Sequence, residues 1–243
     1  MWETRIPSWL YARLYASWRR VRREVDLIDQ VFSRLGARRL LELGCGVGRH
    51  GYLLTKRGFS VLLTDTKDWR HGAAKRLPFV EYDLLKGGEV GWQFEGAYAI
   101  GVFIVMEYVD IKRAFRNVAE LTGGRPFMFD YNFVVHGEPK EVFVRSRGRT
   151  YRALLKREEV KEIEGGFRYD YRVEVLDEEN RVLGVEDTGY PVYKKERILE
   201  ALEDAGLEVL ETIWASWDRE KYMYRFSEKE GDSAFFVVRR ATS

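Results

Sequence analysis

The stretch Leu40-Leu-Glu-Leu-Gly-Cys-Gly-Val-Gly-Arg-His50 passes from an apolar run into a cluster of glycines. The apolar residues predict a short buried strand over Arg39–Leu43, and the glycines predict a tight turn before a helix at His50–Arg57. Glycine lets a ligand approach bare backbone, and a helix N-terminus offers free N–H groups to anionic groups. The stretch therefore indicates a ligand-binding strand–turn–helix unit, although an ordinary turn has a similar pattern.

An aspartate follows each of the next two apolar runs. Asp65 follows Phe59–Thr64, about twenty residues beyond the first glycine, and Asp83 follows Phe79–Tyr82. Because the carboxyl ends of parallel strands meet at one edge of a sheet, we expect both carboxylates to rise at the edge that carries the glycine turn. Rossmann-like sheets use a carboxylate at the position of Asp65 to accept hydrogen bonds from ribose hydroxyls.

Short apolar strands alternate with helices through most of the chain, which predicts a mostly parallel α/β sheet with helices on both faces. The pattern changes near residue 140. Aromatic and apolar residues alternate with charged residues over Phe167–Val175, as in an antiparallel strand with one face in water. We expect Arg149–Lys161 and Arg181–Tyr193 to be its neighbours, giving a three-stranded insert. The predicted organisation is one domain from residues 1–139 and 194–243, with a small antiparallel β insert at residues 140–193.

The other predicted elements complete the α/β pattern. They are helices at residues 8–35, Ile111–Leu121 and Lys194–Ala205, and strands at Ala97–Phe103, Pro126–Asp130, Leu207–Trp214 and Ala234–Arg239.

These motifs resemble those of class I S-adenosylmethionine-dependent methyltransferases. Leu41–His50 resembles the first motif of that family, Val61–Asp65 the ribose-binding motif, and Glu81–Leu84 the segment whose acid holds the adenine amino group. The resemblance covers nearly the whole chain and implies a Rossmann-like, mostly parallel seven-stranded sheet. It implies an enzyme that uses S-adenosylmethionine and releases S-adenosylhomocysteine. The insert resembles that of small-molecule methyltransferases, which often cover the substrate there.

The resemblance also implies a set of cofactor-binding residues. Glu42 and the backbone of Gly44–Gly46 would hold the methionine amino end, Asp65 the ribose, and Asp83 with Leu84 the adenine. The full expected set is Glu42, Gly44, Cys45, Gly46, Gly48, Asp65, Thr66, Asp83, Leu84 and Val102. One departure from the family pattern is the short, Pro78-containing segment between the two aspartates, where the family has a full helix.

No catalytic dyad is evident, and methyl transfer by in-line displacement needs a base only if the acceptor arrives protonated. The candidates after the fourth and fifth strands are Glu107, Tyr108, Asp130, Tyr131, Asn132 and His136. Glu107 can equally brace the following helix, and His136 can equally be a surface residue. For His50 a local structural role, or a place beside the cofactor, is favoured over catalysis. The sequence therefore assigns no catalytic residue.

Composition limits the alternatives. One cysteine and three histidines predict no disulfide and no metal site. No apolar run approaches the roughly 20 residues of a membrane span, and Met1–Trp9 lacks a signal-peptide pattern, so a cytoplasmic protein is expected. The expected oligomeric state is a monomer or a homodimer. Abundant charged residues with few Asn and Gln are typical of thermophilic proteins. A nicotinamide dehydrogenase is disfavoured because its fingerprint needs glycine where Arg49 stands.

The choice of methyl acceptor stays open at this stage. A net charge of +2 does not by itself imply nucleic acid. Arginines gather within residues 19–23 and 145–152, however, and such clusters are either solvated faces or a site for RNA. A small-molecule methyltransferase is the favoured function, ahead of an RNA methyltransferase and a catalytically silent S-adenosylmethionine-binding protein.

Overall fold

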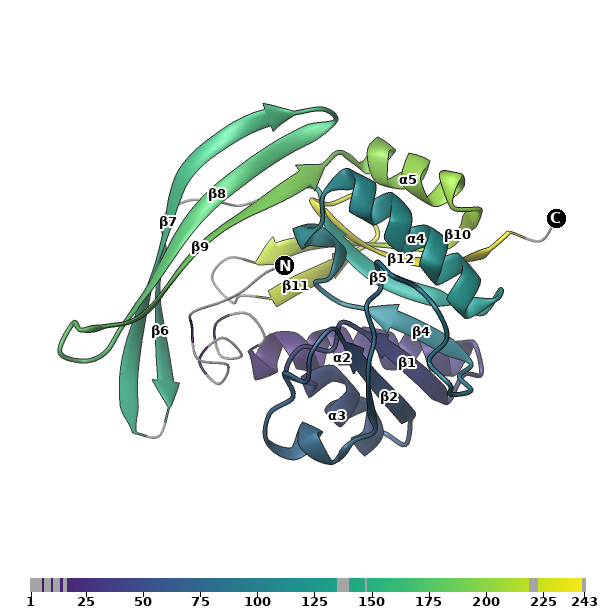
Figure 1. The fold of residues 1–243 in the computed structure, drawn as a ribbon, viewed down its shortest axis with the longest axis horizontal. Coiled ribbons are helices and arrows are strands. Elements are labelled where there is room, and N and C mark those ends of the chain that lie inside the picture. Colours follow the sequence, from purple (N-terminus) through teal and green to yellow (C-terminus); the bar gives the residue numbers. More distant parts are fainter. Residues whose placement is uncertain are drawn as a thin grey trace.

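The computed structural model describes Ile6, Leu10, Leu14 and residues 17–134, 140–146, 148–218 and 223–241 (Figure 1). Helices and strands alternate up to residue 132, antiparallel strands follow, and the alternation then resumes. The helical elements are α2 (Trp18–Arg34), α3 (Arg49–Lys56), η1 (Gly72–Arg76), η2 (Phe103–Val105), α4 (Tyr108–Thr122) and α5 (Lys195–Asp204). The strands are β1 (Arg39–Leu43), β2 (Ser60–Asp65), β3 (Phe79–Glu81), β4 (Gly96–Ala99), β5 (Phe127–Asn132), β6 (Lys140–Ser146), β7 (Arg149–Ile163), β8 (Gly166–Leu176), β9 (Val182–Tyr193), β10 (Leu207–Asp218), β11 (Met223–Ser227) and β12 (Ser233–Arg240).

The main sheet has eight strands in the order β11-β10-β12-β5-β4-β1-β2-β3. The five strands from β5 to β3 in this order run parallel, whereas β12 is antiparallel to both of its neighbours and β11 is antiparallel to β10. The predicted mostly parallel Rossmann-like sheet is therefore confirmed. The additional edge strand β11 was not predicted.

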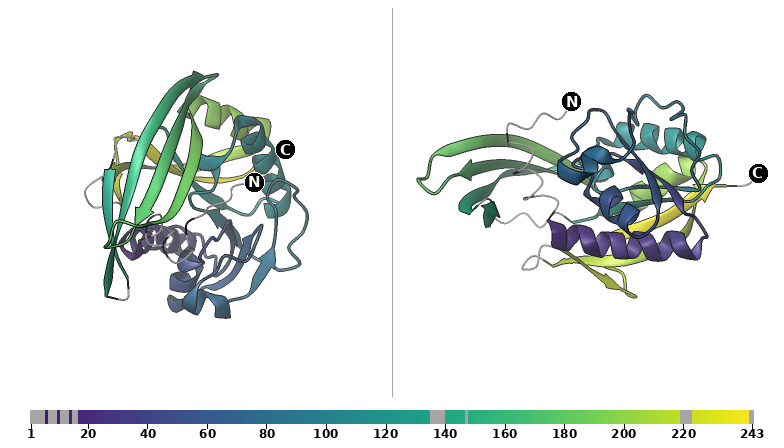
Figure 2. Two further views of the ribbon diagram at one scale, coloured as in Figure 1. Left: turned by 60° about the vertical axis from the view of Figure 1, so that its left-hand side comes forward. Right: turned by 90° about the horizontal axis from the view of Figure 1, so that it is seen from below.

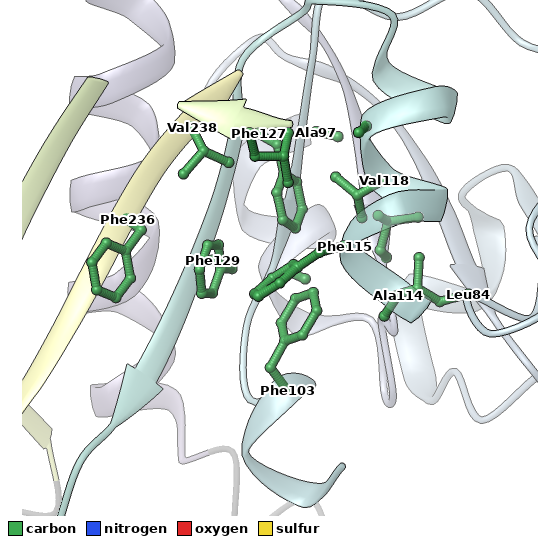
Figure 3. Packing of buried hydrophobic residues seen from close by; sticks show 14 of the residues in the cluster. Leu84, Ala97, Phe103, Ala114, Phe115, Val118, Phe127, Phe129, Phe236 and Val238 are labelled. Atoms are coloured by element: carbon green, nitrogen blue, oxygen red, sulfur yellow. The ribbon is translucent and has the colours of Figure 1, made fainter. Parts of the chain in front are cut away.

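Alternate side chains of the central strands build a core on each face of this sheet. On one face Leu41 and Phe129 pack with α4 and α5, and on the other Leu40 and Met128 pack with α2 and α3. Aromatic rings dominate the first core: Phe103 and Phe115 lie 4.6 Å apart between ring centroids, and neighbouring rings of this core appear in Figure 3. Helices on both faces follow from strands that are apolar on both sides.

Residues 140–193 form a second, four-stranded antiparallel sheet in the order β6-β7-β8-β9, which projects from one side of the main sheet (Figures 1 and 2). The prediction of three strands was wrong, because β6 also pairs with β7. In β6 the charged residues Lys140 and Glu141 precede three consecutive apolar residues, Val142–Val144. The strand therefore lacks the apolar–polar alternation that indicated the other strands of this sheet. The inner face of the second sheet packs on Ile6, Leu10 and Leu14.

The outer face of the second sheet carries paired charges. Arg172 contacts both Glu174 and Asp187, and Lys156 lies 3.1 Å from Glu174. Charges of both signs alternate across the strands on this face, which fits a surface in contact with water.

Two other predicted elements differ from the structure. The helix predicted over residues 8–35 is interrupted at Ser17, whose side chain accepts a hydrogen bond from the backbone N–H of Arg20 and caps α2. The strand predicted over Ala97–Phe103 ends at Ala99, because Gly101 takes a positive φ and η2 begins at Phe103.

Candidate active site

The glycine turn, Gly44–Gly48, follows β1 at the carboxyl edge of the main sheet. Its three glycines all have positive φ angles, a conformation that side chains disfavour. A Cβ on Gly44 would lie 2.5 Å from Val102, so this close approach also requires glycine. The turn is anchored at Cys45, whose backbone N–H donates to the carbonyl of Thr64 at 2.8 Å. The predicted strand–turn–helix unit is present.

Asp65 lies directly against the glycine turn. Its Oδ2 accepts a hydrogen bond from the Gly46 N–H at 2.8 Å, and its Oδ1 accepts one from the Thr66 N–H at 2.8 Å. Burial raises the pKa of this carboxyl, although both N–H groups favour its ionised form. The structure therefore brings together the glycines and the first strand-end acid that the sequence singled out.

Asp83 lies at the same edge, after the neighbouring strand. β3 pairs with β2 so that Asp65 is opposite Glu81, and the Tyr82 N–H donates to the Asp65 carbonyl. The Asp83 carboxylate is partly exposed and accepts a hydrogen bond from the Leu85 N–H at 3.0 Å. Next to it, the Leu84 side chain is buried in the main core.

Glu42 lies beneath the glycine turn. Its carboxylate is 3% exposed, accepts a hydrogen bond from the Gly51 N–H at 3.0 Å and lies 3.8 Å from Nδ1 of His50. Burial raises its pKa to about 7. These contacts brace the glycine turn, and the role of Glu42 at the methionine amino end stays a prediction.

A buried chain of charges joins Glu42 to α2. The Nε2–H group of His50 donates to the Glu24 carboxylate, 2.8 Å away, and Arg20 donates to Glu24 at 2.6 Å. Burial alone would raise the pKa of Glu24, but Arg20 and His50 hold it at about 2. The carboxylates of Glu24 and Glu42 raise the pKa of His50, although burial lowers it. This charge network consists of Arg20, Glu24, His50 and Glu42.

A cavity of about 370 Å³ opens between the glycine turn and the second sheet. Gly44–Val47 and His50 line one side, and side chains of β7, β8 and β9 line the opposite side. The lining from the second sheet is Leu155, Tyr171, Val173, Thr188 and Tyr190. This volume is within the range of small-molecule sites, which are roughly 300–1,000 Å³.

A polar corner of the cavity is formed by β5 and β11. Asp130 accepts a hydrogen bond from the Gly101 N–H at 2.6 Å, and the Tyr224 hydroxyl lies 3.1 Å from Asp130 Oδ2 and 3.0 Å from Asn132 Oδ1. The Arg20 guanidinium lies over the Tyr224 ring, 5.6 Å from its centroid. Asp130, Asn132, Tyr224 and Arg20 all line the cavity.

The remaining candidates for catalysis attach the second sheet to the main domain. Tyr131 is fully buried and its hydroxyl accepts a hydrogen bond from the Tyr193 N–H at 3.1 Å. Glu107 precedes α4 and lies 2.6 Å from Arg168 of β8. Neither residue lines the cavity described above. The candidate His136 lies outside the described residues.

Sequence reasoning missed Arg20, Glu24 and Tyr224 as parts of the site. Arg20 appeared only as a member of a surface arginine cluster, whereas the structure buries it against Glu24. A signal was present: both residues fall among the apolar residues Val21, Val25 and Ile28 of one helix, and buried charges require partners. Tyr224 had no comparable signal because β11 was not predicted.

Comparison with known proteins shows the fold. No family model and no curated protein matches the sequence. Among solved structures, an S-adenosylmethionine-dependent methyltransferase from Clostridium acetobutylicum is 16% identical, with a TM-score of 0.69 over 97% of this chain and 98% of the other. CalS10, an amino pentose methyltransferase from Micromonospora echinaspora, is 17% identical, with a TM-score of 0.67 over 97% and 98%. The sugar N-methyltransferase KedS8 from a Streptoalloteichus species is 20% identical, with a TM-score of 0.65 over 99% and 94%. The chain has the class I methyltransferase fold.

The described part of the chain contains no group of three or more His, Cys, Asp or Glu side chains placed to hold a metal ion. None of its helices is long and apolar enough to cross a membrane.

Proposed function

We propose that this protein is an S-adenosylmethionine-dependent methyltransferase that acts on a small-molecule acceptor. The observation that carries the proposal is the glycine turn hydrogen-bonded to Asp65 at one side of a cavity, with a second sheet on the other side. The class I fold supports it, as does the similarity to solved methyltransferases.

The residues at the sheet edge fit S-adenosylmethionine. At Gly44 a Cβ would clash with Val102, whereas a Cβ on Gly46 would meet nothing within 4 Å, so the turn leaves open space beside Gly46. Glu42 and the backbone of Gly44–Gly46 would hold the methionine amino end, Asp65 the ribose hydroxyls, and Asp83 with Leu84 the adenine. When bound, the cofactor supplies a methyl group on a positively charged sulfur. The protein binds and orients the two reactants and excludes water.

A small molecule fits the cavity better than RNA does. The cavity is lined by aromatic and aliphatic side chains with a few polar groups, which is the usual composition of a small-molecule site. The arginines that suggested RNA are partly accounted for by other contacts: Arg20 is buried against Glu24, and Arg152 pairs with Glu141 and Asn180. The neighbours also include enzymes named as sugar and glycopeptide N-methyltransferases.

We propose a division of labour between the two parts of the chain. Residues 1–139 and 194–243 would hold the cofactor, and the insert at residues 140–193 would cover the acceptor. Tyr171 and Tyr190 of the insert line the cavity, whereas Asp65 and Asp83 do not. The ring centroids of these tyrosines lie 5.9 Å apart, which gives the cavity an aromatic wall.

A binding measurement followed by a transfer assay tests this function. Titration calorimetry should detect both S-adenosylmethionine and S-adenosylhomocysteine, and either compound at about 100 times its dissociation constant should stabilise the fold by about 2.7 kcal/mol. Labelled methyl transfer into cell extract, split into small-molecule, RNA and protein fractions, should label the small-molecule fraction. Binding of a nicotinamide nucleotide with no binding of either compound would overturn the proposal, and label in the RNA fraction would change its acceptor class.

A further inference from the structure

We infer that Asp130 receives the proton that the acceptor loses on methylation, and that Tyr224 positions its carboxylate for this. The inference rests on the proposed function. It assigns a catalytic role at the polar corner of the cavity, to which β11 contributes Tyr224.

The placement of Asp130 follows from strand alternation in β5. Met128 and Asp130 point to the α2 face of the sheet, whereas Phe129 and Tyr131 enter the opposite core. Asp130 is 4% exposed, and each of its oxygens has one hydrogen bond, from Gly101 or Tyr224. Because each oxygen of an ionised carboxylate can accept two bonds, Asp130 keeps capacity for a proton from the cavity.

The other titratable side chains that line this cavity are less suited to the role. Glu24 is bound by both Arg20 and His50, which hold its pKa at about 2 and make it a weak base. Contacts with Glu24 and Glu42 raise the pKa of His50, which favours its protonated form. Burial keeps the pKa of Tyr224 well above its usual value, so the hydroxyl stays a donor.

The electrostatics of Asp130 fit a proton acceptor. Burial raises its pKa, Arg20 lowers it and the nearby Glu24 raises it again; the net result is a pKa above the usual value of an aspartate. The Gly101 N–H and the Tyr224 hydroxyl limit the rise because they stabilise the ionised form. A general base works best when its pKa approaches the operating pH.

The proton balance closes with this assignment. The acceptor atom uses its lone pair to form the bond to the methyl carbon, and the carbon–sulfur bond breaks with its electron pair left on sulfur. As positive charge develops on the acceptor atom in this step, that atom gives its proton to Asp130. One methyl donor is consumed for each proton bound, and the proton returns to water after the products leave.

Asp130→Asn is the first test. The amide oxygen can still accept from the Gly101 N–H, so we expect S-adenosylhomocysteine affinity within about threefold of the wild type. Labelled transfer into the extract fraction that the wild type methylates should fall by about 100-fold or more, the usual contribution of a general base. Asp187→Asn, the same change in a surface ion pair of the second sheet, should leave transfer unchanged.

Tyr224→Phe is the second test and keeps the carboxylate. Loss of the hydroxyl removes a hydrogen bond that lowers the pKa of Asp130, so the acid limb of the pH–rate profile should move to higher pH. Carbon-13 NMR of protein labelled at the aspartate carboxyls, with the Asp130 signal assigned by its loss in Asp130→Asn, should show the same upward shift without any acceptor.

The outcomes separate the two proposals. A wild-type protein that transfers no methyl group overturns the proposed function, and this inference with it. If the wild type is active, a folded Asp130→Asn variant with wild-type transfer overturns the role of Asp130 alone. If Asp130→Asn does not fold, the inference is overturned by a Tyr224→Phe variant whose acid limb stays at the wild-type pH.

Discussion

The two walls of the cavity are built in different ways. The glycine-turn wall comes from consecutive residues, Gly44–Val47. Its main-chain N–H groups donate hydrogen bonds to the Thr64 carbonyl and the Asp65 carboxylate. The opposite wall consists of side chains from three strands of the second sheet. A ligand shared by many enzymes can be held by main-chain geometry, which few substitutions alter, whereas the side chains of the second wall can change without disturbing the turn. The charge network joins α2 to α3 and Glu42, beneath the glycine turn.

The largest effect is expected in the charge network that joins α2 to the glycine-turn wall. Glu24→Gln removes the negative charge between Arg20 and His50 and leaves two buried cationic groups without their shared partner. We expect the free energy of unfolding to fall by about 3–5 kcal/mol. Urea denaturation, followed by circular dichroism, measures this change.

Asp26→Asn on the same helix is the matched control. Asp26 pairs with Arg57 at the surface and is about half exposed, so its loss should cost less than about 1 kcal/mol. Equal losses of the free energy of unfolding in the two variants would show that the charge network does not stabilise the packing of α2 on α3.

An intermediate effect is expected at the glycine-turn wall. Asp65→Ala removes the charge-assisted hydrogen bonds proposed for the ribose and the observed bond to the Gly46 N–H. Affinity for S-adenosylhomocysteine should fall by about 10- to 100-fold, or roughly 1.5–3 kcal/mol, as measured by calorimetry. Asp83→Asn should have a smaller effect, because an amide oxygen still accepts from an adenine amine. Unchanged affinity in a folded Asp65→Ala variant would refute the ribose role.

The smallest effect on cofactor binding is expected at the second wall. Tyr171→Leu removes an aromatic ring from the cavity, so S-adenosylhomocysteine affinity should stay within about threefold, or roughly 0.7 kcal/mol. The KM for the labelled acceptor fraction should rise about 3- to 10-fold through the lost ring contact. Phe143→Leu, at an exposed position of β6, is the control and should change neither value. A large loss of cofactor affinity in Tyr171→Leu would contradict the division of labour.

The sequence predicted the glycine-turn wall well because its determinants are local. An apolar run followed by glycines specifies a strand and a turn, and a strand-end acid needs only the neighbouring strand to meet that turn. Asp65 and Gly46 are 19 residues apart and hydrogen-bonded. The positions of Asp83 and the class I fold follow from the same alternation.

The polar corner and the charge network could not be predicted in the same way. Tyr224 and Asp130 are 94 residues apart, and Glu24 and His50 are 26 residues apart on different helices. Alternation within β5 shows that Asp130 and Tyr131 face opposite sides but not which side holds the cavity. Likewise, the first motif does not show the protein contacts of its acid, and only the fold places Glu42 beside Gly51 and His50.

Cys45 places a thiol group in the glycine turn. Cys45 is the one cysteine of the chain, lies in the turn itself and lines the cavity. Burial raises its pKa, which favours the protonated and less reactive thiol. A ligand bound against the turn would cover Cys45, so alkylation of the thiol should slow when that ligand is present. The chain carries an intrinsic label at the point where a ligand would meet the backbone, and no engineered residue is needed to follow it.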